Sequence, residues 1–512
     1  MVSAAMSKTS AGSSVSGVPG RLSPDTISLV RRLIPLIDDS LEPYAVGGFL
    51  RDAILGRDTR DLDLTVSGNA IAAAGRLAQD LGGTLVPLDM DRGIARVAFQ
   101  QPGVAWNVDI ASLQGDRLHD LARRDFTIDA MTVPLQALAG PDWPVEVTDP
   151  FNGRKDLEQK VVRAVDQNAF MEDGIRLLRA VRLAAVLDFT IDEDTQGLIR
   201  RDVSALDAVS GERIRDELLA ILATSYALKH VYLLDHLGLL CRVVPELEQG
   251  RGVTQPREHY WDVFTHNVET VGAVEGLLER TWQPQWVLDD VAWNDDLDTH
   301  FRQIIADGHT RGTILKLTGL LHDIAKPVTR TVEEDGRIRF LGHSDQGARM
   351  ASAVLNRLRL SKRASNLIET VIEHHLRPAQ MSQGTELATP RAVHRYLRSA
   401  GDAAVDILYL NLADYLAARG SRLERDEWSD YTAMVTHILH TSQVQEEAST
   451  PRLVDGNDLI RALGLDPGPD LGRVLELITE ARAAGEISTA DEALALARNA
   501  IAPQPGSPKG TA

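Results

Sequence analysis

The sequence contains one cysteine, few aromatic residues and no long apolar run. Among its 512 residues only Cys241 is a cysteine, which excludes an intramolecular disulfide and a metal site built on several thiolates. Aromatic residues make up 5% of the chain, so its cores must consist mainly of Leu, Ile, Val and Ala. No apolar run approaches the ~18 residues of a membrane-spanning helix. The first 22 residues lack the apolar segment of a secretory signal, and we therefore expect a cytoplasmic protein without a membrane segment.

The sequence also has fewer positively charged than negatively charged residues. Asp and Glu number 73 against 54 Lys and Arg, which gives a formal net charge of −19. Indiscriminate binding of nucleic acid needs a globally positive surface, so any contact with nucleic acid here must use a local basic face. The hydrophobic content of 44% and the charged content of 25% are typical of globular domains and exclude a collagen-like, coiled-coil or wholly disordered chain.

The hydrophobic pattern divides the chain into a mixed region and a helical one. Up to about residue 150, short alternating runs predict strands, with helices over 49–55 and 69–81 between them. This pattern is typical of an α+β domain with a small mixed sheet. From about residue 165 onward the pattern is helical almost throughout, beginning with a helix predicted over 172–188.

A glycine turn followed by paired carboxylates is the first group of residues that indicates chemistry. Gly47 and Gly48 lie between a predicted strand and a predicted helix, where free backbone N–H groups and the helix N-terminus can contact a phosphate. Arg51, one turn into the helix, can reach the same phosphate. Strand alternation places Asp61 and Asp63 on one face of the next strand, where they suit Mg²⁺ holding a triphosphate.

The strand over 106–111 repeats this arrangement. Its alternation places Asp109 on the polar face, as a third carboxylate that either helps to bind metal or activates an attacking hydroxyl. An Asp-x-Asp pair alone is usually a solvated strand face. The combination with the glycine turn, Arg51 and Asp109 favours a catalytic site.

Polar residues at a spacing of three form the second group. Asp173, Arg176, Arg179 and Arg182 are predicted to share one stripe of the 172–188 helix, and Arg123-Arg124-Asp125 precedes them in the chain. A carboxylate and a guanidinium one turn apart offer an acceptor and donors to a base edge, and further arginines suit phosphates. A surface helix with salt bridges would show the same spacing.

Five motifs occur in order between Gly47 and Arg215: Gly-Gly-x-x-Arg-Asp with Asp-x-Asp, Arg123-Arg-Asp-Phe-Thr-Ile-Asp-Ala-Met131, Asp149-Pro-Phe-Asn-Gly153, Glu172-Asp-x-x-Arg176 and Gly211-Glu-Arg-Ile214. With these motifs the segment resembles the class II tRNA nucleotidyltransferase and bacterial poly(A) polymerase family.

The resemblance implies a nucleotidyltransferase head, a helical neck, and RNA bound by the helices beyond. It implies that Asp61 and Asp63 bind Mg²⁺ and that Asp173 and Arg176 choose between CTP and ATP. The other nucleotide-binding residues would be Gly47, Gly48, Arg51, Arg124, Asp125, Arg179 and Arg182. The segment 111–120 is shorter than the loop of typical CCA-adding members and in this respect resembles CC-adding members.

Histidines and aspartates on the later helices form the third group. In chain order they are His266, His322, Asp323, His343, His374, His375 and Asp414. Imidazole and carboxylate ligands without thiols suit Mn²⁺, Fe²⁺, Ni²⁺ or Mg²⁺ better than structural zinc. The order resembles the HD phosphohydrolase superfamily, which implies that His266, His322, Asp323 and Asp414 are the core ligands. By the same resemblance His343, His374 and His375 can hold a second metal.

These observations predict a multidomain enzyme. We expect disordered tails at 1–22 and 502–512, a nucleotidyltransferase head at 23–150, a helical neck that binds RNA at 151–250, an HD domain at 251–420 and a further helical region at 421–501. The predicted function is addition of C, A or both to the tRNA 3′ end from CTP and ATP, by two-metal nucleotidyl transfer. Three alternatives stay open: a poly(A) polymerase, a metal phosphohydrolase that uses the head only to bind RNA, and a non-catalytic RNA-binding protein.

Overall fold

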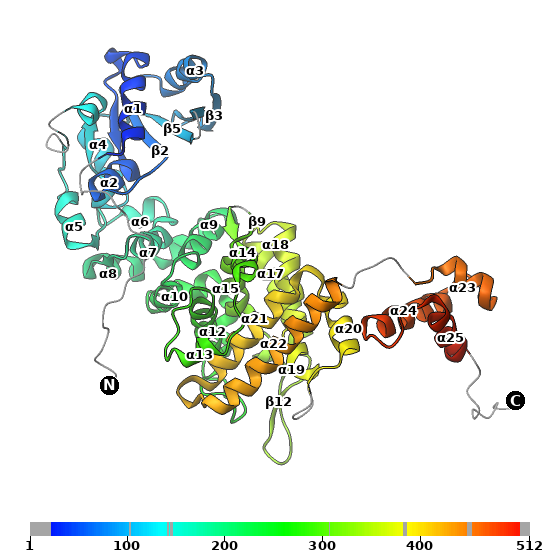
Figure 1. Ribbon diagram of the computed structural model, residues 1–512. Coiled ribbons are helices and arrows are strands. Elements are labelled where there is room, and N and C mark those ends of the chain that lie inside the picture. The colour runs from blue at the N-terminus through cyan, green and yellow to red at the C-terminus, as the bar shows by residue number, and fades with distance from the viewer. Residues whose placement is uncertain are drawn as a thin grey trace, which may run out of the picture. The chain divides into compact units, whose positions relative to one another are not determined.

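The structure, a computed structural model, describes residues 22–101, 104–140, 143, 147–306, 308–381, 387–447 and 453–501. It divides into two compact units (Figure 1). The first runs to Val209 and includes Leu237–Leu239, and the second consists of Ser210–His236 and the chain from Leu240 onward. The predicted tails lie outside the described residues except for Leu22, which is buried. In the described part of the chain, no helix is both long and apolar enough to cross a membrane.

The first unit is built on a mixed sheet, as the sequence predicts. Its described strands lie in the order β3-β4-β5-β2-β1-β6, in which β2 and β5 run parallel and the other neighbours antiparallel. The strands are β1 (Tyr44–Val46), β2 (Asp61–Val66), β3 (Thr84–Asp89), β4 (Ile94–Gln101), β5 (Val104–Ser112) and β6 (Thr132–Pro134). Helix α1 (Pro24–Leu33) precedes the strands, and the helices between them are α2 (Gly47–Leu55), α3 (Ala70–Leu81) and α4 (Arg117–Ala122).

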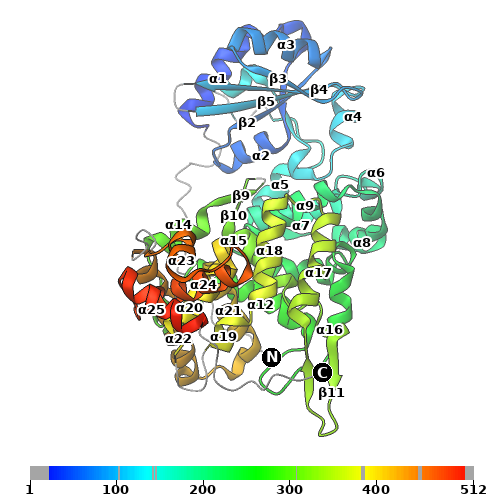
Figure 2. The same ribbon diagram turned by 90° about the vertical axis from the view of Figure 1, so that its right-hand side faces the viewer.

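Alternation in the central strands separates an apolar face from a polar one. Leu62 and Leu64 of β2 and Val108 and Ile110 of β5 are buried, whereas the residues between them carry the carboxylates. The apolar α3 packs on β4 and β5. Figure 2 shows α3 on one side of these strands and α2 on the other. The polar face is therefore open on the side of α2, where a site can form.

Short elements complete the first unit. They are α5 (Gly153–Gln159), β7 (Val161–Val162), α6 (Ala169–Glu172), α7 (Arg176–Leu187), β8 (Thr190–Ile191) and α8 (Glu193–Asp202). The predicted helix over 172–188 is thus shorter and begins later. It starts at Arg176 as α7 and is separated from α6, which ends at Glu172, because Asp173 has an extended backbone (φ −152°, ψ 106°).

The second unit is helical apart from short hairpins. Its first elements are α9 (Gly211–Leu222), α10 (Ala227–His236), α11 (Leu240–Val243), α12 (Val263–Leu278), α13 (Trp286–Asp289), α14 (Asp295–Arg302), β9 (Ile304–Ala306), β10 (His309–Thr310), α15 (Arg311–Leu321), α16 (Lys326–Thr329), β11 (Arg330–Val332) and β12 (Ile338–Phe340). There follow α17 (His343–Arg357), α18 (Lys362–His374), α19 (Arg377–Met381), α20 (Pro390–Ala400), α21 (Ala404–Arg419) and α22 (Arg425–Glu447). The last are α23 (Gly456–Leu463), α24 (Pro469–Ala483) and α25 (Ala490–Ile501).

The core of this unit surrounds α12, α15 and α21. The first two of these helices pack against each other, and both contact α21. All residues of α15 are buried. A helix buried on all sides needs apolar residues around its whole circumference, and its polar side chains need partners. The terminal helices α23–α25 have a small core of their own around Leu459, Ile478 and Ala497.

Candidate active site

The glycine turn at the start of α2 brings the backbone close to polar side chains. Gly47 has a φ of +66°, which a residue with a side chain rarely adopts. A Cβ atom there would lie 2.9 Å from Nη1 of Arg124 and 3.3 Å from Oδ2 of Asp63. Only glycine therefore lets the turn, Arg124 and Asp63 lie together.

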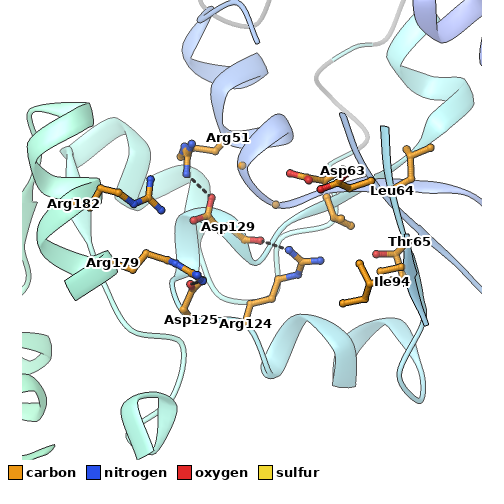
Figure 3. A pocket seen from close by; sticks show the side chains of 15 residues that line it. Arg51, Asp63, Leu64, Thr65, Ile94, Arg124, Asp125, Asp129, Arg179 and Arg182 are labelled. Carbon is orange, nitrogen blue, oxygen red and sulfur yellow. Dashed lines mark hydrogen bonds and ion pairs between the residues drawn. The ribbon is translucent and has the colours of Figure 1, made fainter. Parts of the chain in front are cut away.

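These residues line a cavity of about 380 Å³ in the first unit (Figure 3). Predicted site residues around it are Gly47, Gly48, Arg51, Asp63, Asp109, Arg124, Asp125, Arg179 and Arg182. Asp129, Thr65 and Ile94 also line it and were missed by the sequence reasoning. The structure thus brings together the turn, four carboxylates and four arginines from segments up to about 135 residues apart.

Two of the three predicted carboxylates face each other across neighbouring strands. In the register of β2 and β5, Asp63 lies beside Asp109 and Asp61 beside Asn107. The backbone N–H of Phe49 donates to Oδ2 of Asp63 over 3.3 Å, but burial dominates and raises the pKa of Asp63 to about 6. Burial makes the ionised form of this carboxylate unfavourable, and a bound cation would offset its charge. Asp63 is therefore a suitable cation ligand.

Asp61 is placed differently from the other two. It is exposed, it does not line the cavity, and its Oδ1 accepts a 2.8 Å hydrogen bond from Nδ2 of Asn107. It remains on the same polar face as Asp63, two residues away along β2. Asn107 therefore orients a carboxylate that stands at the edge of the site.

Asp109 has a guanidinium partner that the sequence reasoning missed. Arg96 of β4 lies beside it in register, and Nε and Nη2 of Arg96 donate to its two carboxylate oxygens over 2.7 and 2.8 Å. The sequence shows that Arg96 is a charged residue within an otherwise largely apolar strand. The register that pairs Arg96 with Asp109 is not.

A network of arginines and aspartates forms the opposite wall of the cavity. Arg51 donates to Asp129 over 2.9 Å and contacts Asp52, and Arg179 donates to Asp125 over 2.7 Å. Burial raises the pKa of Asp129, although Arg51 acts against this. Burial also opposes the charge of Asp125, but Arg179 and its neighbours hold the pKa of Asp125 below the usual value. The wall therefore combines fixed guanidinium groups with counter-charges.

Of the pair predicted to read the base, Arg176 begins α7, whereas Asp173 lies outside this helix. Asp173 precedes α7, and its Oδ1 accepts a bond from the backbone N–H of Ile175. Arg176 donates to the backbone oxygens of Ala169 and Arg123 and to Glu172. Neither residue lines the cavity. The stripe prediction is wrong for Asp173, because the chain is extended there.

The histidine cluster lies in the second unit and brings together six of the seven predicted residues. One group consists of His266, His322, Asp323 and Asp414, and a second shares Asp323 with His343 and His375. Nε2 of His266 lies 3.2 Å from Nε2 of His322 and 3.0 Å from Oδ1 of Asp414. Two imidazole nitrogens that face each other among carboxylates fit a cation between them.

Hydrogen bonds to the backbone fix the orientation of three of these rings. Nδ1 of His322, His343 and His375 bonds to the carbonyl oxygen of Gly319, Phe340 and Ile372, over 2.8, 2.7 and 2.6 Å. Each ring therefore presents Nε2 to the centre, as metal-binding histidines commonly do. Burial lowers the pKa of His375 to about 4. Burial also opposes the charge of His322, but Asp323 and Asp414 raise its pKa to about 10.

His374 belongs to neither group, so the structure does not bring it together with the other predicted ligands. It is the last residue of α18, and the adjacent His375 points in a different direction around the helix axis. Two other residues at the cluster were missed. Nζ of Lys326 lies 2.5 Å from Oδ2 of Asp323 and 3.3 Å from Nε2 of His259, whose ring is 5.4 Å from that of His266.

Family models match three segments of the chain. Residues 43–163 match the family model of the Poly A polymerase head domain, residues 188–250 that of a probable RNA and SrmB-binding site of polymerase A, and residues 296–419 that of the HD domain. An A-adding tRNA nucleotidyltransferase from Deinococcus radiodurans is 33% identical over 490 residues, which cover 94% of this chain and all of that one. The chain belongs to the tRNA nucleotidyltransferase family.

Other members of the family differ in the nucleotide that their names give. A CC-adding tRNA nucleotidyltransferase from Thermus thermophilus is 30% identical over 460 residues, 89% of this chain and 92% of that one. Among solved structures, the Thermotoga maritima CCA-adding enzyme complexed with tRNA shares the fold, with a TM-score of 0.59 and 23% identity over 94% of this chain and 97% of that one. The fold and family are therefore confirmed.

Proposed function

We propose that this protein extends the 3′ end of tRNA by adding C, A or both, with CTP and ATP as the nucleotide donors. The observation that supports this most directly is the pair Asp63 and Asp109 beside the Gly47-Gly48 turn, in a cavity that arginines line. The poly(A) polymerase alternative would use the same residues. The family relatives named above are A-adding and CC-adding enzymes, and this favours tRNA as the acceptor.

Each group in the cavity has a role in this proposal. The glycine turn and Arg51 bind the triphosphate. Its negative charge is neutralised by three further arginines, Arg124, Arg179 and Arg182. Asp125 holds Arg179 in place through their ion pair. Asp61 and Asp63 would hold Mg²⁺, which stabilises the developing charge and activates the 3′-hydroxyl when bound. Asp109 completes the carboxylate set as a further ligand or as the acceptor of the hydroxyl proton. No covalent intermediate with the protein is required.

The nucleotide choice is a finer proposal. Asp173 offers an acceptor and Arg176 offers donors, which together complement cytosine or adenine but face a ring N–H in uracil or guanine. The two residues must then exchange some of their present backbone bonds for the base. The short 111–120 segment favours CTP, hence CC addition.

The experiment that tests this function is incubation of the full-length protein with tRNA that lacks its 3′ terminus, with each labelled nucleotide in turn. Addition of two C residues from CTP is the expected result. Addition of A to an acceptor that already ends in CC would assign A addition instead. Long A tails would assign a poly(A) polymerase, and no addition in Mg²⁺ would overturn the proposal.

A second candidate function is metal-dependent phosphohydrolysis in the second unit. The observation that favours it is the buried set of four Nε2-presenting histidines around Asp323, with Asp414 beside it. Such a donor set suits Mn²⁺, Fe²⁺ or Ni²⁺. Metal analysis of the full-length protein, combined with a phosphatase assay on small phosphate esters, tests it.

A further inference from the structure

The strand order gives the carboxylate site two distinguishable sides. The β1–α2 turn with Gly47 and Gly48 lies on one side of β2, and β5 followed by β4 lies on the other. Asp63 on β2 and Asp109 on β5 therefore stand between the glycine turn and Arg96 on β4. Neighbouring strands are about 4.8 Å apart, so Arg96 starts roughly 10 Å from β2.

Arg96 is not part of the nucleotide cavity. Its side chain is 37% exposed and does not line the cavity, whereas Asp109 does. The bidentate contact to Asp109 uses Nε and Nη2. A guanidinium carries five N–H donors, so the Nη1 edge lies outside this pair of bonds. This edge is a cationic donor beside three carboxylates, on the side away from the glycine turn.

The geometry of nucleotidyl transfer indicates what approaches the carboxylates from the side of Asp109 and Arg96. In an in-line displacement the attacking oxygen and the leaving group lie on opposite sides of the phosphorus. If the leaving pyrophosphate is bound at the glycine turn and Arg51, the attacking 3′-hydroxyl must come from the side of Asp109 and Arg96. An RNA strand that arrives there brings phosphates toward Asp61, Asp63 and Asp109, whose charges repel them.

We propose that Arg96 binds a backbone phosphate near the 3′ end of the RNA that is extended, through the guanidinium edge that faces away from Asp109. This inference rests on the proposed function for the identity of the RNA. Arg96 would then have two positioning roles, since its inner edge holds Asp109 and its outer edge holds the acceptor strand. It would also offset the repulsion between that strand and the carboxylates.

RNA binding without catalysis tests this contact directly. The full-length protein is titrated in EDTA against labelled tRNA that lacks the terminal CCA, and against the same RNA shortened by its last unpaired nucleotide. We expect Arg96→Gln to weaken binding of the longer RNA about three- to tenfold and to reduce the salt slope by about 0.7. The effect should be smaller with the shortened RNA.

Three variants separate this role from a purely structural one. Arg96→Lys keeps the charge and should retain most of the affinity. Arg92→Gln removes a 73% exposed arginine before the same strand and should bind like the wild type. Asp109→Asn frees the guanidinium and should keep or improve RNA affinity while it stops addition. If Arg96→Gln only disturbs Asp109, its RNA affinity and salt slope will equal those of the wild type, and the proposal is overturned.

Steady-state addition provides the second readout. Arg96→Gln should raise the KM for tRNA and leave the KM for CTP and ATP unchanged. The reverse pattern would place Arg96 on the nucleotide and overturn the proposal. A wild-type protein that adds no nucleotide would refute the proposed function, whereas the salt slope in EDTA would still decide whether Arg96 contacts RNA.

Discussion

The two candidate metal sites of this protein hold their ligand side chains in different ways. In the second unit, buried imidazoles are fixed by hydrogen bonds from Nδ1 to the backbone and present Nε2 to shared carboxylates. In the first unit the carboxylates stand partly open on a sheet face, and Arg96 or Asn107 already binds two of them. The first arrangement suits a resident metal. The second suits ions that arrive with a charged substrate and leave with the product.

The largest effect should follow from removing Asp63. Asp63→Asn should lower nucleotide addition by about a thousandfold or more, because a buried ligand for the catalytic ions is lost. Asp80→Asn, an exposed position on α3, is the matched control. The metal content of the second unit should not change in either variant. Addition by Asp63→Asn within tenfold of the wild type, at saturating Mg²⁺, would refute the assignment of this carboxylate.

Two adjacent histidines, His374 and His375, test the metal ligands of the second unit. His375→Ala should reduce the bound transition metal of the purified protein, whereas His374→Ala should not, because only His375 belongs to a ligand group. Metal analysis by mass spectrometry gives the stoichiometry. Nucleotide addition should stay within about twofold in both variants. Equal metal content in the two variants would contradict the ligand set.

Nucleotide choice should change by a smaller factor. Arg176→Ala should reduce the preference for CTP or ATP over UTP and GTP by roughly a hundredfold, because buried hydrogen bonds to the base are lost. The ratio of kcat/KM for the four nucleotides measures this. Arg182→Ala, which removes a phosphate-side arginine, should lower kcat/KM for all nucleotides alike. An unchanged ratio in Arg176→Ala would mean that this residue only supports the loop before α7.

The smallest effect is on the stability of the metal-free protein. Since burial raises the pKa of Asp63 to about 6, this carboxyl favours the folded state at acid pH and loses that contribution as the pH rises through 6. Asp63→Asn should therefore stabilise the protein at pH 8 by about 1–3 kcal/mol, and by much less at pH 4.5. Urea unfolding in EDTA at the two pH values measures it. The same gain at both would contradict a raised pKa.

The sequence predicts the parts of these sites that depend on local periodicity. Alternation alone places Asp61 and Asp63 on one strand face, and the ordered histidines point to one cluster. It does not show that Arg96 binds Asp109, because strand register depends on side-chain packing between distant segments. It misplaces Asp173, since one extended residue takes that side chain off the helix stripe. It also does not distinguish His374 from His375, whose side chains leave the helix axis about 100° apart.

The ion pair between Arg179 and Asp125 affects how the protein can be divided. Asp125 is buried, and its charge is balanced from α7, more than 50 residues later in the chain. The backbone of Asp125 and Thr127 also bonds to the segment 163–165. When only the head has left the ribosome, Asp125 lacks the guanidinium that bonds to it, and a fragment that ends at residue 150 would lack it permanently. Autonomous folding of the catalytic region, during synthesis or in a truncated protein, thus requires the chain through α7.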